Sequence, residues 1–153
     1  MNQLDSLYQQ IILEESKTRR GADLTPEQAL DTHLPATMGQ CHQLNPVCGD
    51  EITLRIETSG STVSGIHWAG DGCSISMASA SILSDMVVGV DRNEVQSLID
   101  RFREVMRSRG KLAADEEVLG DAAALSGVSK FPARVKCAML AWVAAEDALN
   151  QTR

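Results

Sequence analysis

The feature that most constrains this fold is a change in the spacing of apolar residues near position 74. Apolar and polar residues alternate over residues 51–57, a pattern that predicts a half-buried strand. Residues 59–61 predict a turn, and residues 62–69 predict a second strand that returns antiparallel to the first. From Ser74 onward the apolar residues follow helical spacing instead. We therefore expect an antiparallel hairpin against which helices pack.

The remaining elements follow from the same patterns. Residues 37–44 are expected to form an edge strand, residues 17–35 a loop with one helical turn, and residues 111–130 a connector with a short Ala-rich helical piece. Helical periodicity and stop residues predict helices over residues 3–16, 74–89, 91–110 and from Pro132 onward. The last helix is expected to bury Val135, Met139, Trp142 and Val143. We predict an α+β fold, a small antiparallel sheet of about three strands with helices packed on one face, as a single domain over residues 1–153.

Composition narrows the function classes. The chain has 153 residues and a formal charge of −7, which argues against nucleic acid as a partner because phosphate binding needs clustered Lys and Arg. No apolar run approaches the roughly 18 residues that a membrane helix needs. Residues 1–5 lack the basic and apolar regions of a signal peptide, so we expect a cytoplasmic protein without a membrane partner. In a reducing compartment, cysteines are more often metal ligands or reactive thiols than disulfides.

Two cysteines lie at predicted junctions. Cys48 is followed by Gly49 and Asp50, and a backbone turn at the glycine lets thiol and carboxylate face one ion, although such residues are also ordinary loop chemistry. Cys73 follows a strand and precedes a helix, where free N–H groups and the helix dipole favour a thiolate. The alternative for Cys73 is a small buried residue in a capping turn. Asp71, just before it, is either a support for the site or an ordinary turn residue.

A third cysteine, Cys137, lies early in the last predicted helix. Arg134 is three residues before it and Lys136 is adjacent, and a nearby cation lowers a thiol pKa. The alternative is that both cations are solvated and Cys137 is a core residue. Together with Asp50, the three cysteines would supply three sulfurs and one carboxylate, a complete tetrahedral set for zinc. Cys41, in the middle of a predicted strand, is interpreted as structural, and the isolated residues His33, His42 and His67 as surface or strand residues.

Three segments resemble the SufU proteins, a branch of the IscU-like family of iron–sulfur cluster assembly proteins that also includes the N-terminal domain of NifU. They are residues 45–50, residues 70–81 and residues 129–138, and the match runs in order over roughly residues 3–148. Residues 119–121 and 125–128 are similar to a segment that SufU carries and IscU lacks. IscU proteins have a His immediately before the last cysteine, whereas this chain has Lys136, as SufU does.

The resemblance implies a zinc-dependent sulfurtransferase that works with a pyridoxal-phosphate-dependent, SufS-type cysteine desulfurase and passes sulfur to Suf cluster-assembly scaffold proteins. It implies that Cys48, Asp50, Cys73 and Cys137 hold zinc, that Cys48 takes up sulfur as a persulfide, and that Arg134 lies near the site. Two alternatives stay open. One is a scaffold that builds a [2Fe–2S] cluster from iron on the same thiols, and the other is a structural zinc domain that serves only protein interaction.

Overall fold

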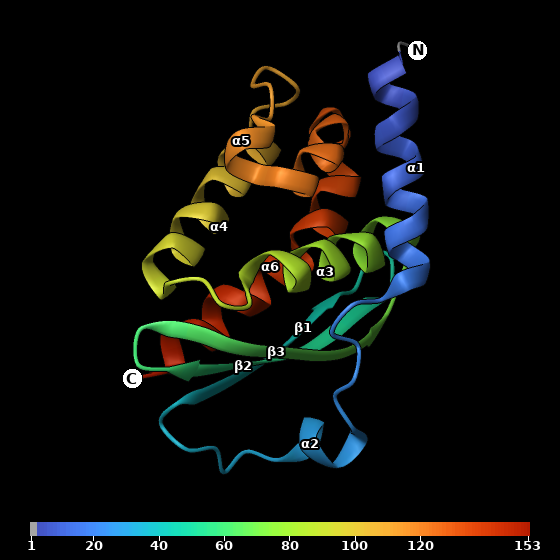
Figure 1. Cartoon of the computed structure of the whole chain (residues 1–153). Coiled ribbons are helices and arrows are strands. Elements are labelled where there is room, and N and C mark those ends of the chain that lie inside the picture. The colour runs from blue at the N-terminus through green and yellow to red at the C-terminus, as the bar shows by residue number, and fades with distance from the viewer. Residues whose placement is uncertain (1–2) are drawn as a thin grey trace.

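A computed structural model describes residues 3–153, with side chains from residue 5 onward, so the expected absence of a signal peptide falls partly outside the described residues. Its centre is a three-stranded antiparallel sheet in the order β1-β2-β3 (Figure 1). The strands are β1 (Met38–Asn45), β2 (Asp50–Ser59) and β3 (Thr62–Asp71). Both the predicted hairpin and the predicted edge strand are confirmed. Leu54 of β2 lies opposite Cys41 on one side and Trp68 on the other, which fixes the register.

Six helical segments gather on one side of the sheet (Figure 1), which confirms the predicted fold class. They are α1 (Gln3–Thr18), α3 (Ser74–Val87), α4 (Arg92–Arg107), α5 (Glu116–Leu119), the 3-10 helix η1 (Gly120–Lys130) and α6 (Pro132–Gln151). The connector over residues 111–130 is therefore more helical than the sequence suggested. Within residues 3–153, no helix is both long enough and apolar enough to cross a membrane.

The core lies between the sheet and α3, α4 and α6. Phe102 of α4 stacks on Trp142 of α6, with ring centroids 4.0 Å apart, and both side chains are fully buried. The predicted core face of α6 is partly wrong, because Val135, Met139 and Val143 are only partly buried. The buried face is instead rich in alanine, formed by Ala138, Ala141, Ala144, Ala145 and Ala148. Small side chains let a helix backbone approach its neighbours closely, and the larger residues flank that contact.

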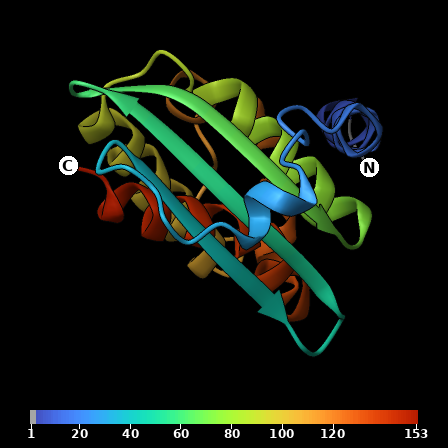
Figure 2. The same ribbon diagram turned by 90° about the horizontal axis from the view of Figure 1, so that it is seen from below.

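Of residues 3–153, the opposite face of the sheet carries only the short helix α2 (Pro26–Leu30) and its connections (Figure 2). Thr25 and Gln28 form a capping box at its start, which confirms the single helical turn expected in this region. The Arg55 guanidinium donates to the carbonyl of Gln28 at 2.8 Å, and Gln40 donates to the carbonyl of Ala29 at 3.0 Å. Because α2 itself buries no residue, these polar contacts hold it on the sheet.

Candidate metal centre

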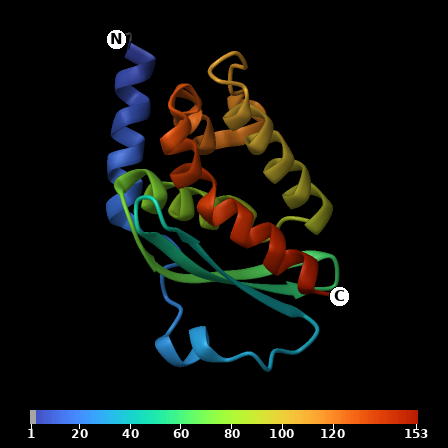
Figure 3. The ribbon, with the colours of Figure 1, turned by 180° about the vertical axis from the view of Figure 1, so that it is seen from behind.

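Three segments that are distant in sequence meet at one end of the sheet (Figure 3). The first is the loop 46–49 between β1 and β2, which carries Cys48, with Asp50 as the first residue of β2. The second is the junction between β3 and α3, where Cys73 is the N-cap residue. The third is the second turn of α6, which carries Cys137. All four predicted ligands therefore belong to a single neighbourhood.

The ligand atoms of Cys48, Asp50 and Cys137 all lie within 4.8 Å of one another. The Cys48 thiol donates to Asp50 Oδ2 at 3.1 Å, and its sulfur is 3.6 Å from the sulfur of Cys137. Cys73 is at the edge of this group, with its Sγ 3.7 Å from Asp50 Oδ2. The Asp50 carboxylate is thus the common partner of the cluster.

Local backbone chemistry explains how the loop presents its thiol. Asn45 accepts the Val47 N–H on its side-chain Oδ1 at 3.2 Å, while its backbone carbonyl accepts the Gly49 N–H at 2.8 Å. Gly49 has a φ of +74°, a conformation that side-chain-bearing residues rarely adopt. The chain therefore reverses between Asn45 and Asp50, and Cys48 is left exposed at the tip.

A second glycine, Gly72, leaves space for the Asp50 carboxylate beside the start of α3. A Cβ on Gly72 would lie 2.6 Å from Asp50 Oδ1, closer than side-chain carbons approach other atoms. The missing side chain leaves room for the carboxylate beside the start of α3, where the Cys73 N–H donates to Oδ1 at 3.0 Å. Asp50 thereby satisfies the backbone N–H of the N-cap residue itself, while the Cys73 side chain makes no capping hydrogen bond.

Burial and hydrogen bonding have opposite effects on the pKa of Asp50. Burial, with only 2% of the residue exposed, would raise the pKa of this carboxyl. Hydrogen bonds from Ser76, Cys48, Cys137 and the Cys73 N–H outweigh burial and hold the pKa below its usual range. The site therefore contains a buried carboxylate in its charged form, which is the form that binds a cation.

The pKa of the Cys137 thiol is shifted in the opposite direction, upward. It is 1% exposed, and burial, followed by its hydrogen bond to Asp50, raises the pKa of its thiol to about 12. Of the two interpretations left open for this cysteine, the one that agrees with the described protein is a buried Cys137 with Arg134 and Lys136 exposed to solvent. If a metal ion were bound among these donors, the Cys137 thiol would lose its proton in spite of its raised pKa, because a coordinating thiol is deprotonated.

The donor set fits zinc. With Zn–S bonds of about 2.3 Å, two sulfur ligands of a tetrahedral site lie roughly 3.8 Å apart, and a sulfur and an oxygen ligand roughly 3.5 Å apart. The sulfurs of Cys48 and Cys137 are 3.6 Å apart, and the distances from Asp50 Oδ2 to the Cys48 and Cys73 sulfurs are 3.1 and 3.7 Å. Two thiols and one carboxylate therefore have spacings that fit one such ion, and the Cys73 sulfur, which lies outside the group within 4.8 Å, would have to move closer to complete the set.

The three predicted supporting residues lie outside this group of donors. Asp71 is exposed and accepts the Gly72 N–H at 2.9 Å, so its described contact belongs to its own turn. Arg134 is exposed on the first turn of α6. Lys136 is also exposed and lines a groove beside the loop that carries Cys48.

Sequence reasoning missed Ser76, which is 2% exposed on the first turn of α3. Its hydroxyl donates to Asp50 Oδ2 at 2.5 Å and lies 3.5 Å from the Cys73 sulfur. The available sequence signal was its spacing, because a residue three positions after Cys73 shares its face of the helix.

The remaining thiol and the histidines lie elsewhere. Cys41 is buried in the middle of β1 and accepts a hydrogen bond from Gln43 Nε2 at 3.3 Å, in agreement with a structural role. His42 pairs with Glu51 and His67 with Asp23, both as contacts between strands or loops at the surface. His33 is exposed, and none of the three histidines contributes to the cluster formed by the described residues.

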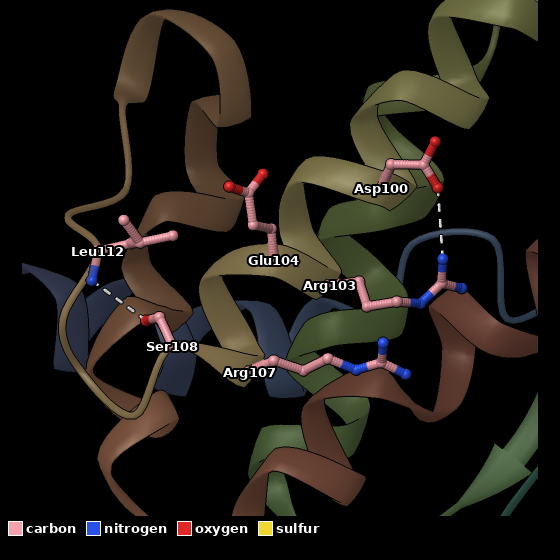
Figure 4. Close-up of a pocket in the computed structure, with 6 residues that line it drawn as sticks. All are labelled: Asp100, Arg103, Glu104, Arg107, Ser108 and Leu112. Carbon is pink, nitrogen blue, oxygen red and sulfur yellow. Dashed lines mark hydrogen bonds and ion pairs between the residues drawn. The ribbon is translucent and has the colours of Figure 1, made fainter.

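Two of the depressions on the described surface differ in their relation to the cluster. The first, of about 310 Å³, adjoins the cluster and is lined by Gln43, Leu44, Asn45, Pro46, Val47, Lys136, Met139, Leu140 and Val143. The second lies on α4 and the loop after it (Figure 4) and shares no lining residue with the cluster. Its Arg103 is paired with Asp100 at 3.3 Å and with Glu146 at 2.6 Å, so its charges are largely satisfied internally.

This chain combines a three-stranded antiparallel sheet, covered by helices on one face, with cysteine and aspartate side chains that could hold a metal ion at one end. The chain belongs to the family described as the NifU-like N-terminal domain, which matches residues 8–149. It is 41% identical over 143 residues to the zinc-dependent sulfurtransferase SufU of Bacillus subtilis (strain 168), covering 94% of this chain and 89% of that protein.

Two further relatives carry scaffold names. The iron–sulfur cluster assembly scaffold protein IscU of Streptococcus pyogenes serotype M1 is 41% identical over 108 residues, covering 71% of this chain and 67% of that protein. A crystal structure of a putative iron–sulfur cluster assembly scaffold protein for the SUF system, from Fervidobacterium islandicum AW-1, superposes with a TM-score of 0.76 at 29% identity. The alignment covers 91% of this chain and 93% of that one. These relatives of the chain therefore carry two different functional names, sulfurtransferase and scaffold protein.

Proposed function

We propose that this protein is a zinc-dependent sulfur-relay protein in iron–sulfur cluster assembly. It accepts sulfur on Cys48 from the persulfide of a SufS-type, pyridoxal-phosphate-dependent cysteine desulfurase and passes it to Suf cluster-assembly scaffold proteins. The observation that carries the proposal is the unequal exposure of the cluster: Cys48 is exposed, Cys73 is half-buried, and Cys137 and Asp50 are buried. One thiol can meet a partner while the other donors stay enclosed.

Zinc would be held by Cys48, Asp50, Cys73 and Cys137. When bound, it keeps its thiol ligands deprotonated without redox chemistry of its own. Asp50, buried and charged, would supply one carboxylate ligand. Cys73 is the N-cap residue of α3 and Cys137 lies in α6, whereas Cys48 lies on a loop. We assign release from the metal to Cys48 because it is the exposed donor, whereas Asp50 and Cys137 are enclosed.

The transfer step balances without an external oxidant or reductant. The Cys48 thiolate attacks the terminal sulfur of the donor persulfide, a new S–S bond forms on Cys48 Sγ, and the donor cysteine leaves as a thiolate. An acceptor thiolate then attacks the outer sulfur and releases Cys48. Cys48 is the exposed thiol of the cluster, which supports its assignment as the attacking group.

The groove beside Cys48 is where we place the donor enzyme. Val47, in the loop 46–49 that carries Cys48, is 81% exposed, and Leu44 is 53% exposed. Both residues line this groove. Lys136 lies at the same groove, and the stretch from Ala122 to Ala145 contains basic residues but no acidic one, in a chain of net charge −7. An apolar surface with one cation, Lys136, in its lining suits a partner segment that carries apolar side chains and an acidic one.

The test combines metal analysis with sulfur mapping. The zinc-loaded protein is incubated with a SufS-type desulfurase and L-cysteine, and persulfide is located by mass spectrometry of peptides protected by alkylation. We expect one zinc per chain, faster desulfurase turnover and sulfur on Cys48. The absence of sulfur from every cysteine would overturn the relay.

The second candidate function is a scaffold for a [2Fe–2S] cluster on the same thiols, which the scaffold names of two relatives support. It makes a different prediction for the same preparation. A scaffold reconstituted with iron and sulfide shows visible absorbance and transfers an intact cluster to an apo-acceptor. A relay protein with zinc at one per chain remains colourless and delivers only sulfur.

A further inference from the structure

Both oxygens of the Asp50 carboxylate accept hydrogen bonds from the start of α3. Oδ1 accepts the Cys73 N–H at 3.0 Å, and Oδ2 accepts the Ser76 hydroxyl at 2.5 Å. Oδ2 is also the oxygen that contacts the thiols of Cys48 and Cys73. The Ser76 hydroxyl therefore acts on the oxygen that would face a metal ion.

Ser76 differs from the other buried serines of α3 in the direction of its hydroxyl. Ser79 donates to the carbonyl of Ala138, Ser81 donates to Glu15, and Ser84 donates to the carbonyl of Ala80 in its own helix. Those contacts join helices or close a helical turn. Among these four serines, only Ser76 turns toward the cysteine and aspartate donors.

The hydrogen bonds at Oδ2 do not all survive metal binding. The Cys48 and Cys73 thiols are donors only while they carry protons, and thiol ligands give up those protons to bind a metal. The Ser76 hydroxyl keeps its proton, and so does the Cys73 N–H. A carboxylate oxygen has a second acceptor position, so Oδ2 can accept from Ser76 and bind an ion at the same time.

We infer that Ser76 is a positioning residue that holds Asp50 Oδ2 toward the three thiols and so sets the metal affinity of the site. This inference rests on the proposed zinc site. Residues that orient a metal ligand through hydrogen bonds typically change metal affinity by roughly 10- to 100-fold when removed. Ser76 acts through Asp50 and takes no part in sulfur transfer itself.

The experiment measures zinc affinity by competition with a chromophoric chelator. We expect roughly 10- to 100-fold weaker binding for Ser76→Ala, as for other hydrogen-bonding supports of metal ligands. Ser76→Thr, which keeps the hydroxyl, should recover part of that affinity. The matched control is Ser84→Ala, which removes another buried α3 hydroxyl and should bind zinc like the wild type. Thermal unfolding of the metal-free variants shows that each of them folds.

A double-mutant cycle separates positioning from a general packing effect. In an Asp50→Ala background, the further change Ser76→Ala should cause no additional loss of zinc affinity, because its partner is gone. Cobalt-substituted protein adds a spectroscopic readout, since Ser76→Ala should shift the ligand-field bands while the sulfur-to-cobalt bands of three thiolates remain.

The outcomes distinguish this inference from the proposed function. If wild type binds zinc through the four ligands but Ser76→Ala binds equally tightly, or loses the same factor with and without Asp50, the positioning role is overturned. If wild type itself binds no zinc, the proposed zinc relay fails and the role of Ser76 fails with it.

Discussion

Two regions of this molecule each place a cysteine thiol beside an aspartate carboxylate, but we expect different chemistry from them. At the end of the sheet, the thiols of Cys48 and Cys137 lie around a buried, charged Asp50. In the middle of β1, the thiol of Cys41 has one carboxylate partner, Asp147, whose residue is exposed. The first arrangement gathers several donors onto one point and exposes one of them, whereas the second isolates a single thiol. Convergence and exposure, rather than the presence of a thiol beside an acid, separate a candidate reactive site from a structural cysteine.

The largest expected effect comes from exchanging the thiols of the two environments for hydroxyls. Cys48→Ser should reduce persulfide uptake from the desulfurase to background, because the thiolate is the nucleophile and a serine hydroxyl is not ionised near neutral pH. Cys41→Ser is the matched control and should accept sulfur at the wild-type rate. Peptide mass spectrometry after a single turnover measures both. Sulfur uptake by the Cys48→Ser variant would remove the distinction between the two sites.

The next comparison concerns the carboxylates. Asp50→Ala removes a ligand and should weaken zinc binding by more than the roughly 100-fold typical of supporting residues, whereas Asp147→Ala should leave the affinity unchanged. Chelator competition provides the measurement, and circular dichroism checks the fold. Equal affinities for the two variants would show that Asp50 is not a ligand.

A smaller effect is expected at the groove beside Cys48. Leu44→Asp places a charge on its apolar lining and should lower the efficiency of sulfur transfer about five- to tenfold, the range of a moderate interface residue. Leu30→Asp, at an 82% exposed leucine on α2, is the control on the opposite face of the sheet. Desulfurase kinetics at varied concentrations of each variant give the comparison. An equal loss in both variants would place the docking surface elsewhere.

The smallest effect tests the isolation of Cys41 through pH. Burial and then the hydrogen bond to Asp147 raise the pKa of this thiol to about 11. Because the folded pKa is raised, the stability that this thiol contributes is present below its ordinary pKa and is lost as pH rises toward 11. Alkylation of Cys41 in the folded protein should therefore accelerate up to about pH 11, while in denaturant it levels off near the ordinary thiol pKa. Matching profiles in both states would contradict the described burial.

The sequence was a good guide wherever one local pattern decided the structure. The alternation over residues 51–57 predicted β2, and the change of period at Ser74 predicted the start of α3, as observed. It was a poorer guide to α6, where Trp142 is buried as predicted but alanines take the place of Val135, Met139 and Val143 on the buried face. Hydrophobic periodicity gives most weight to bulky residues, whereas close packing of a helix on its neighbours selects small ones.

The sequence by itself determined the fold class, the family resemblance and which four residues are candidate ligands, because these depend on residue type, order and local period. Only the tertiary structure decided that Cys137 is buried while Cys48 is exposed, and that Ser76 and Gly72 fit around Asp50. Those facts depend on distances between segments that lie far apart in the chain. Such distances are set when β2, α3 and α6 pack together, and no local pattern encodes them.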